Sequence, residues 1–479
     1  VEFSNPADRP IGFWPNTHSE GGGRYYVDNT REGLDAPGEW YHDRLKHEVL
    51  YIAASGEDPN QLEFSAPVVT GNLLALQDAD GVTFNNLSFQ HVDWECGLSQ
   101  VCDRQSAEWE TTSAVYVNAS SVTLDSVHVA HVGPTAVWLD GPRSNNVLRH
   151  STLQDLGSGG VRVGGIDRNH ILQNGSVTDN VISDGGWVTP SGTGIFVQFA
   201  FGCDVSFNDV SQLMYTGISV GWSWNFNETE CGHHLVSYNH VHHLGVGVQR
   251  QLGDAMACYY TLGQNHHTVF DHNLCHDVYA FYTGGYGVSQ DQGTSDILFT
   301  NNVCFRTSAS PQNLHYGARV EYRNNIFALG YTSSWTDQNP GGLRTSPQTS
   351  LPNSVLFRNN IVYEANKTAV LFEGDWNATQ SSLWNYTFVN NIYYSTAQDL
   401  STESVFGGCS VRMCRASARQ LSLDEWRGLD FVSGDTVADP GFVDPHRYSN
   451  YNFTLEGSSE ALQLGFQQID LSRVGPRKY

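Results

Sequence analysis

A short phrase centred on asparagine recurs along most of the chain and constrains its fold more than any other feature. Each copy has β-branched or aromatic residues before one or two Asn and an apolar residue after them, as in TNNVCF and RNNIVY. Successive copies are separated by intervals such as 29, 23 and 31 residues, which indicates one coil of a solenoid per copy. The sequence therefore predicts an all-β protein, a parallel β-helix whose coils stack about 4.8 Å apart. The copies centre on Asn86, Asn180, Asn208, Asn239, Asn273, Asn302, Asn325, Asn360 and Asn391, with degenerate forms near Ser126 and Ser151.

We interpret the recurring Asn as structural. At a tight bend between two parallel sheets, its side-chain amide bonds to the Asn of the coils above and below, and its backbone tolerates a left-handed conformation. Asn86 is expected in this row, which would leave its glycosylation motif unmodified. Cys275 and Cys304 each follow a ladder Asn by two residues, so we expect them on adjacent coils, either as buried thiols or as a bridge.

The pattern of residue types changes at both ends of the repeat region. Residues 1–70 alternate polar and aromatic residues between turns, which indicates a small β subdomain or cap. Residues 71–400 carry the coils of the β-helix. Residues 401–479 become irregular and include a short helical candidate, LSLDEWRGLDF, with acidic residues in its first turn. We expect this last segment to cover the open end of the coil stack.

Composition restricts the partners of the protein. The chain has 25 basic and 50 acidic residues and a net charge of −25, which repels nucleic acid, anionic membranes and polyanionic glycans. No apolar window approaches the roughly 18–20 residues of a membrane span. Charged residues make up only 16% of the chain, whereas 47 residues are Gly and 12% are aromatic, as in turn-rich β proteins. Neither nucleic acid nor a membrane is an expected partner, and the oligomeric state stays open.

Cysteines and glycosylation motifs favour a secreted protein. Among nine cysteines, two close pairs are candidates for disulfides that staple small loops, and their spacing does not match a zinc site. The first pair is Cys96 with Cys102, and the second pair is Cys409 with Cys414. The chain begins at Val1 rather than Met, which fits a removed signal segment or a trimmed chain. The candidate glycosylation sites are Asn118, Asn174, Asn227, Asn366, Asn377, Asn385 and Asn452.

Two acidic residues stand on what we expect to be neighbouring coils. Asp254 lies in GDAMACYYTLG and Asp291 lies in GVSQDQGTSD, with one Asn-centred phrase between them and another after them. Stacking would place the two carboxyl groups side by side, which is what glycosidic bond cleavage needs. One group protonates the departing oxygen, and the other attacks the anomeric carbon or activates water. The structural alternative is that Asp254 caps a turn and Asp291 bonds to the backbone of a loop.

Nearby aromatic and polar residues are candidates for substrate binding. The aromatic side chains of MYTGISVGWSW suit stacking on the apolar C–H face of a pyranose, and core packing is the alternative. The histidine of NLHYG is expected to bond a substrate hydroxyl or to hold a carboxylate, with a structural histidine as the alternative. The candidate substrate-binding residues are His315, Tyr215, Trp222, Trp224, Gln292 and Tyr260.

The His-rich phrase ECGHHLVSYNHVHHLG raises the question of a metal site. Alternation along a strand points Asn239, Val241 and His243 away from His240 and His242. We therefore assign no metal ligand in this phrase and expect no cofactor.

An ordered set of longer phrases carries a family resemblance. The phrases are GLDAPGEWYHDR, SGTGIFVQFAFGCDVSFNDVSQLMYTGISVGWSW, HHLGVGVQRQLGDAMACYYTLG, GGYGVSQDQGTSDILFTNNVCFRT, NLHYG and WRGLDFVSGDTVADPGFVDP with LGFQQIDLSRVGPR. Over roughly residues 25–477 the chain resembles the right-handed parallel β-helix proteins of glycoside hydrolase family 141. The resemblance implies a secreted hydrolase of fucosidase or xylanase type acting on a cell-wall or matrix glycan, with Asp254 and Asp291 as acid/base and nucleophile or water activator.

Two departures from the family pattern bear on activity. Where such proteins usually carry Asp-Glu before Gly-Ser-Ser, this chain has DQGT, with Gln292 in place of the Glu. The first acidic phrase holds one extra residue, with Cys258 and Tyr259 where small or aliphatic residues are commoner. A catalytically inactive structural or glycan-binding β-helix glycoprotein is therefore the first alternative. A polysaccharide lyase is the second, but it typically needs a basic proton abstractor, and no Lys/Arg cluster stands beside Asp254.

Overall fold

The chain contains two compact units. The computed structural model describes residues 29–95, 103, 105–107, 112–245, 256–280, 284–315, 317–330, 344–346, 353–364, 371–372, 384–407, 420–446 and 451–478. The first unit ends at Val68 and the second begins at Val69. The three-part division at residues 70 and 400 stays a prediction. None of the described helices is long and apolar enough to cross a membrane.

The first unit is small and contains an antiparallel strand pair. β1 (Trp40–Asp43) pairs with β2 (Glu48–Tyr51). The 3₁₀ helices η1 (Arg31–Gly33) and η2 (Pro59–Gln61) precede and follow this pair along the chain.

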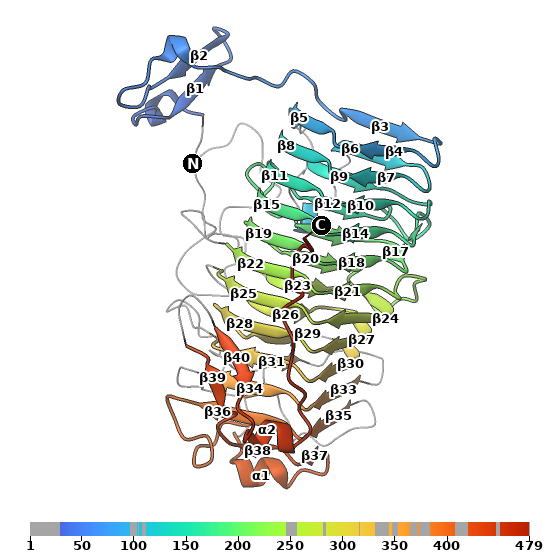
Figure 1. The fold of residues 1–479 in the computed structure, drawn as a ribbon, viewed down its shortest axis with the longest axis vertical. Coiled ribbons are helices and arrows are strands. Elements are labelled where there is room, and N and C mark those ends of the chain that lie inside the picture. The colour runs from blue at the N-terminus through green and yellow to red at the C-terminus, as the bar shows by residue number, and fades with distance from the viewer. Residues whose placement is uncertain are drawn as a thin grey trace. The chain divides into compact units, whose positions relative to one another are not determined.

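The second unit is a parallel β-helix made of three long sheets (Figure 1). Each coil passes through sheet 1, sheet 2 and sheet 3 in turn, and its strands pair in parallel with those of the neighbouring coils. The predicted all-β parallel β-helix is therefore confirmed. Two further strand pairs, β13 with β17 and β39 with β40, lie outside these sheets, as do the helices η3, α1 and α2.

The strands of the three sheets have the following bounds in the described residues. Sheet 1 contains β3 (Leu74–Gln77), β6 (Ser113–Asn118), β9 (Thr135–Leu139), β12 (Val161–Val163), β16 (Ile195–Val197), β20 (Ile218–Val220), β23 (Ala257–Thr261), β26 (Tyr286–Gln290), β29 (Gln312–His315) and β32 (Arg344–Ser346). Sheet 2 contains β4 (Thr83–Asn85), β7 (Thr123–Asp125), β10 (Val147–Arg149), β14 (Ser176–Thr178), β18 (Asp204–Ser206), β21 (Leu235–Ser237), β24 (Gln264–Asp271), β27 (Ser295–Thr300), β30 (Ala318–Arg323), β33 (Asn353–Arg358), β35 (Trp384–Val389) and β37 (Val432–Ser433). Sheet 3 contains β5 (Ser88–Val92), β8 (His128–Val132), β11 (Thr152–Leu156), β15 (Val181–Gly185), β19 (Asp209–Leu213), β22 (His240–Leu244), β25 (Leu274–Val278), β28 (Val303–Thr307), β31 (Ile326–Ala328), β34 (Ile361–Glu364), β36 (Ile392–Ser395) and β38 (Thr436–Val437). The remaining elements are β13 (Leu172–Gln173), β17 (Ala200–Phe201), β39 (Phe442–Asp444), β40 (Asn452–Leu455), η3 (Gln105–Ala107), α1 (Leu423–Arg427) and α2 (Glu460–Gln463).

The predicted Asn ladder lies at the bend between sheets 2 and 3. Nδ2 of Asn239 donates to Oδ1 of Asn273 at 3.0 Å, and Nδ2 of Asn273 donates to Oδ1 of Asn302 at 2.9 Å. Each amide also donates to a backbone carbonyl, so its polar atoms are satisfied inside the core. The row ends at buried Asp435, which accepts from Nδ2 of Asn391 at 2.9 Å. The structural interpretation of the repeated Asn is confirmed.

Two details of the predicted ladder are wrong. The left-handed residue is not the ladder Asn but the residue before it, such as Tyr238 with φ 53° or Asn301 with φ 54°. That residue turns the chain, and the ladder Asn is then free to point its amide inward. Asn86 has φ 54° and is exposed, so it occupies the turning position, and Leu87 stands where the ladder residue belongs. Its sequon is therefore not part of the buried row.

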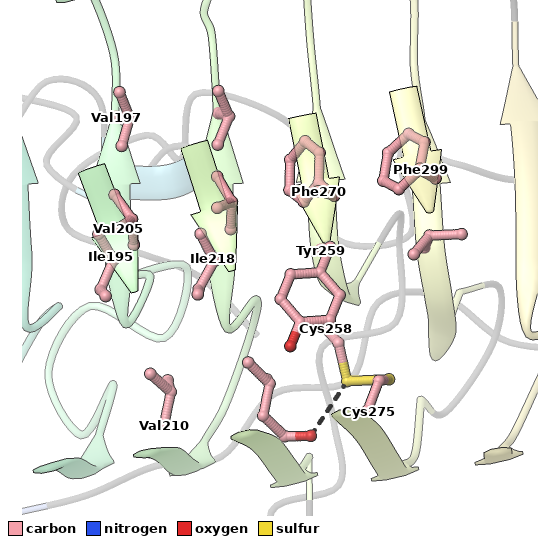
Figure 2. Close-up of a cluster of buried hydrophobic side chains, with 14 of the residues drawn as sticks. Ile195, Val197, Val205, Val210, Ile218, Cys258, Tyr259, Phe270, Cys275 and Phe299 are labelled. Carbon is pink, nitrogen blue, oxygen red and sulfur yellow. Dashed lines mark hydrogen bonds between the residues drawn. A yellow bond between two sulfur atoms is a disulfide. The ribbon is translucent and has the colours of Figure 1, made fainter. Parts of the chain in front are cut away.

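Stacked rows of apolar side chains fill the interior (Figure 2). On sheet 2, the inward row changes from aliphatic residues such as Val205 to aromatic residues, and the rings of Phe270 and Phe299 stack 4.6 Å apart on adjacent coils. This continuous core supplies the burial that no single coil provides.

The buried cysteines lie as the sequence predicts but form a different bridge. Cys275 pairs in register with Cys304, which confirms their position on adjacent coils. Cys275 forms a disulfide with Cys258 of sheet 1 across the interior, whereas Cys304 is a buried thiol (Figure 2). The alternative of a bridge between Cys275 and Cys304 is therefore wrong, and the sequence did not indicate Cys258 as the partner.

The two predicted loop staples are not tested by the structure. Cys96 and Cys102 lie outside the described residues, so their disulfide stays a prediction. Cys409 and Cys414 also lie outside the described residues, and the same holds for their disulfide. The bridge that the described residues contain is a cross-link inside the core, not a staple of a surface loop.

The end of the coil stack is covered by α1. The predicted short helix with Asp424 and Glu425 in its first turn is confirmed, and Ser422 and Glu425 form a capping box at its N-terminus. Trp426 of this helix is fully buried, with its ring stacked 5.4 Å from Phe372 and 5.5 Å from Phe406. The open apolar end of the core is thereby closed.

The C-terminal tail, residues 464–477, runs back along the outside of the bend that holds the Asn ladder (Figure 1). Asn359 and Asn324 donate to the Leu464 and Gln467 carbonyls at 2.9 Å each. Further along, the Gly475 N–H donates to the Tyr238 carbonyl at 2.8 Å. Arg477, near the end of the tail, donates hydrogen bonds to the carboxylate of Asp179 through its backbone N–H and its Nε. The tail therefore ties together coils that are far apart in the stack.

Candidate functional site

Asp291 stands directly after β26 on the outer face of sheet 1. The preceding Gln290 points inward and bonds to Tyr322, so alternation directs Asp291 outward. The following turn is tightly held: Gly293 has φ 89°, and a Cβ there would lie 2.0 Å from the Asn225 carbonyl oxygen, so only glycine fits. Thr294 closes the turn by donating its Oγ1 hydrogen to the carbonyl of Thr261 on the neighbouring coil at 2.9 Å. The acid is thus carried on a rigid support.

Three donors surround the Asp291 carboxylate. The Tyr260 hydroxyl donates to Oδ2 at 2.5 Å, while His315 Nδ1 and the Gln292 N–H each donate to Oδ1 at 2.7 Å. The register between β26 and β29 places His315 beside Asp291. Burial, followed by the charge of Asp291, raises the pKa of Tyr260 well above its ordinary value, so the phenol remains a donor. Asp291 is 5% exposed, and its setting suits a negatively charged carboxylate.

Two of the predicted aromatic residues lie beside this group. Trp222 is partly buried and packs against the cluster that contains Tyr260, with its ring 5.4 Å from Phe196 and 6.3 Å from Trp224. Trp224 is 46% exposed, so it offers a ring face to solvent. Tyr215, by contrast, is buried in the main core and offers none. The two tryptophans therefore form the accessible aromatic surface at this site.

Sequence reasoning missed Asp103 and Gln105, which stand between β5 and β6 in the chain. Gln105 Nε2 donates to the Tyr260 hydroxyl at 2.9 Å. Two residues earlier, Asp103 accepts from Ser191 Oγ at 2.5 Å. The Asp103 side chain is exposed to solvent, yet desolvation by nearby protein atoms raises its pKa. A raised carboxyl pKa is a property of proton donors in active sites, so Asp103 is a second acidic candidate.

Arg162 is another residue of this face that the sequence did not single out. It lies in register between Trp138 and Phe196, with its guanidinium carbon 4.4 Å and 5.9 Å from the two ring centroids. It also donates to Gln198 and is only 4% exposed. Aligning the coils by their ladder residues could have placed Arg162 in one row with Trp138 and Phe196.

Several predicted residues are not tested by the structure. Asp254 lies outside the described residues, so its pairing with Asp291 stays a prediction. Among the predicted glycosylation sites, Asn174 and Asn227 are exposed, Asn118 and Asn452 are partly buried, Asn385 lies on β35, and Asn366 and Asn377 lie outside the described residues.

The strand alternation expected for the His-rich phrase is wrong at one position. His243 has φ 54°, which breaks the alternation and turns its ring toward its neighbour. Its Nδ1 lies 2.6 Å from Nδ1 of His242. Within the described residues, two groups could hold a metal ion, and both lie on sheet 3: Asp209, His240 and His242, and His243, His276 and Asp277.

Two cavities lie away from Asp291. One, of about 410 Å³, is lined by residues that include Phe201, Cys231 and His266. The other, of about 420 Å³, is lined by residues 394–400 and Val437. Neither contains a residue predicted to bind substrate, so the site is defined by its side-chain contacts.

Comparisons with known proteins agree with this architecture. A family profile described as "Right handed beta helix region" matches residues 113–303. A solved structure titled "Glycoside hydrolase" is similar with a TM-score of 0.52 and 18% identity, over 66% of this chain and 61% of that chain. The chain thus spans about three-fifths of the length of that protein. Among curated proteins, none matches the sequence.

Two further solved structures are similar at lower scores. A complex of XylC with xylose has a TM-score of 0.44 and 12% identity, over 86% of this chain and 66% of that chain. A complex of the alginate lyase AlyF-OU02 with G6 has a TM-score of 0.46 and 13% identity, over 88% and 98%. Likeness at such identities shows the fold alone, and the fold is the right-handed parallel β-helix that the sequence predicted.

Proposed function

We propose that the outer face of sheet 1 around Asp291 binds a glycan and hydrolyses its glycosidic bond. The observation that carries this proposal is the buried Asp291 carboxylate, fixed by Tyr260 and His315 beside a tryptophan pair that reaches solvent. Aromatic rings bind the C–H face of a sugar, and a fixed carboxylate stabilises the positive charge that develops on the ring. The resemblance to glycoside hydrolase family 141 supports the same reaction.

The two carboxyl groups of such a reaction need different environments. Asp291, with three donors around it, suits the negatively charged role of nucleophile or water activator. The proton donor is either Asp254, which the resemblance to the family favours, or Asp103, whose pKa is raised by desolvation. His315 and Tyr260 position Asp291, and Gln292 is available for a substrate hydroxyl.

The proposed substrate class follows from the net charge of the protein. A net charge of −25 disfavours polyanionic glycans, so a neutral or weakly charged cell-wall or matrix glycan is the proposed substrate. Arg162, a buried cation of this face, is already engaged by two rings and Gln198, so it is not placed to neutralise a uronate. A secreted location stays part of the proposal.

The test is release of reducing sugar from a panel of algal and plant glycans. We expect Asp291→Asn to lower the rate at least 100-fold with unchanged folding, and the same loss in whichever of Asp254→Asn or Asp103→Asn removes the proton donor. Asp155→Asn, which changes an exposed acid of sheet 3, is the matched control and should keep full activity. Wild-type activity in the Asp291 variant would exclude this site.

Glycan binding without hydrolysis is the second candidate. The observation that favours it is the low exposure of Asp291, whose side chain is 7% accessible and accepts from Tyr260 and His315. In that case the wild-type protein binds an oligosaccharide but releases no reducing sugar, and replacement of Trp224 by Ala weakens binding.

A further inference from the structure

A group of imidazoles and carboxylates forms on the outer face of sheet 3, on three consecutive coils. We call it the histidine cluster. It is partly accessible, since the side chains of His240 and His276 are 25% and 14% exposed. Its members are Asp209 of β19, His240, His242 and His243 of β22, and His276 and Asp277 of β25.

Two histidines of the cluster, His240 and His276, face each other through their Nε2 atoms. Nε2 of His240 lies 2.9 Å from Nε2 of His276. Their other ring nitrogens face carboxylates: Nδ1 of His240 is 3.0 Å from Asp209, and Nδ1 of His276 is 2.7 Å from Asp277. A carboxylate only accepts, so each Nδ1 carries the hydrogen, and a neutral imidazole has only one. Two lone pairs are therefore held within 2.9 Å of each other, which is favourable only if both nitrogens share a cation.

We propose that the histidine cluster binds a divalent transition-metal ion, with Nε2 of His240 and of His276 as ligands. Two nitrogens each about 2.05 Å from an ion, at about 90° to each other, lie about 2.9 Å apart, and a tetrahedral angle needs only a few tenths of an ångström more. Imidazole ligands select zinc, copper or nickel over magnesium or calcium. His242 lies beside this pair, with Nε2 3.3 Å from Oδ1 of Asp209 and Nδ1 2.6 Å from Nδ1 of His243.

Carboxylates hold the two histidines in the orientation that a metal site needs. A metal-binding histidine usually donates its other nitrogen to a carboxylate, which fixes the tautomer and aims the lone pair. Asp209 and Asp277 hold these positions. Arg306 pairs with Asp277, so Asp277 orients His276 rather than binding the ion. Phe305 stacks on His276 with the ring centroids 5.1 Å apart and limits its rotation.

The consequence is a cross-link between coils. His240 and His242 belong to β22 and His276 belongs to β25, while Asp209 supports them from β19. Because an ion bound between them exists only when the coils are stacked, its binding adds to the stability of the folded state.

Metal titration of the untagged, chelator-treated full chain tests the proposal. Zn²⁺ binding is followed by calorimetry, and Co²⁺ binding by its visible d–d absorption. We expect one ion per chain and a rise in the melting temperature on Zn²⁺ addition. His240→Ala and His276→Ala should each lower the affinity at least 100-fold, and Asp209→Asn should lower it about 10–100-fold.

A matched control is the double variant that combines His233→Ala with His267→Ala. These rings also lie on adjacent coils, 4.9 Å apart, but outside the cluster, so the variant should bind Zn²⁺ as the wild type does. If His276→Ala does not fold, the more exposed His240→Ala carries the test. The proposal is overturned if the wild type binds no Zn²⁺ or Co²⁺, or if the His240 variant binds as tightly as the wild type; a proton shared by the two rings would then be the cation.

Discussion

Replacing one residue of the Asn ladder should destabilise the coil stack by an amount that the structure allows us to work out. Asn273 lies in the middle of the row and is fully buried. Its Oδ1 accepts from the backbone N–H and from Nδ2 of Asn239, each at 3.0 Å. Its Nδ2 donates to the Val236 carbonyl at 2.8 Å and to Oδ1 of Asn302 at 2.9 Å. Asn273→Ala removes all four contacts and supplies no substitute partner.

The expected cost follows from counting the groups that lose a partner. The Asn239 N–H is left buried without an acceptor, which costs about 1–3 kcal/mol. Asn239 Nδ2, the Val236 carbonyl and Asn302 Oδ1 each lose one hydrogen bond, at about 0.5–1.5 kcal/mol each. The sum is about 2.5–7.5 kcal/mol, a large fraction of the free energy of unfolding of a typical domain.

Urea unfolding followed by tryptophan fluorescence measures this change, and hydrogen exchange shows whether protection falls in the coils next to Asn273. Asn169→Ala, at an exposed turn, is the matched control and should change the free energy of unfolding by less than about 0.5 kcal/mol. A loss below about 1 kcal/mol for Asn273→Ala would refute the reasoning, because it would mean that the ladder amides are not required to satisfy the buried backbone.

Two further predictions concern cross-links within the stack. The Cys258–Cys275 disulfide closes a separation of 17 residues, so Cys258→Ala with Cys275→Ala should lower the free energy of unfolding by about 3 kcal/mol. A reducing agent should reproduce this loss in the wild type and leave the double variant unchanged; an equal effect on both would contradict the bridge. Burial opposes ionisation of Asp179, but hydrogen bonds from Arg477 outweigh it and hold its pKa below the ordinary 3.8. The docking of the tail is therefore complete above pH 3.8 and is lost as the pH falls through the lower, folded-state pKa. Hydrogen exchange of residues 464–477 at about pH 6 and at about pH 2–3 measures the release, and Arg477→Ala should abolish the difference.

The predicted site shows where reasoning from the sequence reaches its limit. Asp291 and His315 could be selected as chemically competent residues, because both stand in turn-rich phrases of the repeat region. Their contact depends on the register that pairs β26 with β29, and coil lengths that vary along the chain conceal that register. Gln105 reaches Tyr260 from a sequence distance of 155 residues, which no local pattern indicates.

The sequence by itself determined the architecture of this protein. An Asn phrase repeated at coil-length intervals requires parallel stacking, because only stacking satisfies the buried amides, and it also placed Cys275 next to Cys304. Only the tertiary structure decided which side chains meet on the outer faces of the sheets. The left-handed φ at residues such as His243 reverses strand alternation, and coil lengths set which residues become neighbours. For that reason the tyrosine and histidine around Asp291, and the facing imidazoles of His240 and His276, emerged only from the folded chain.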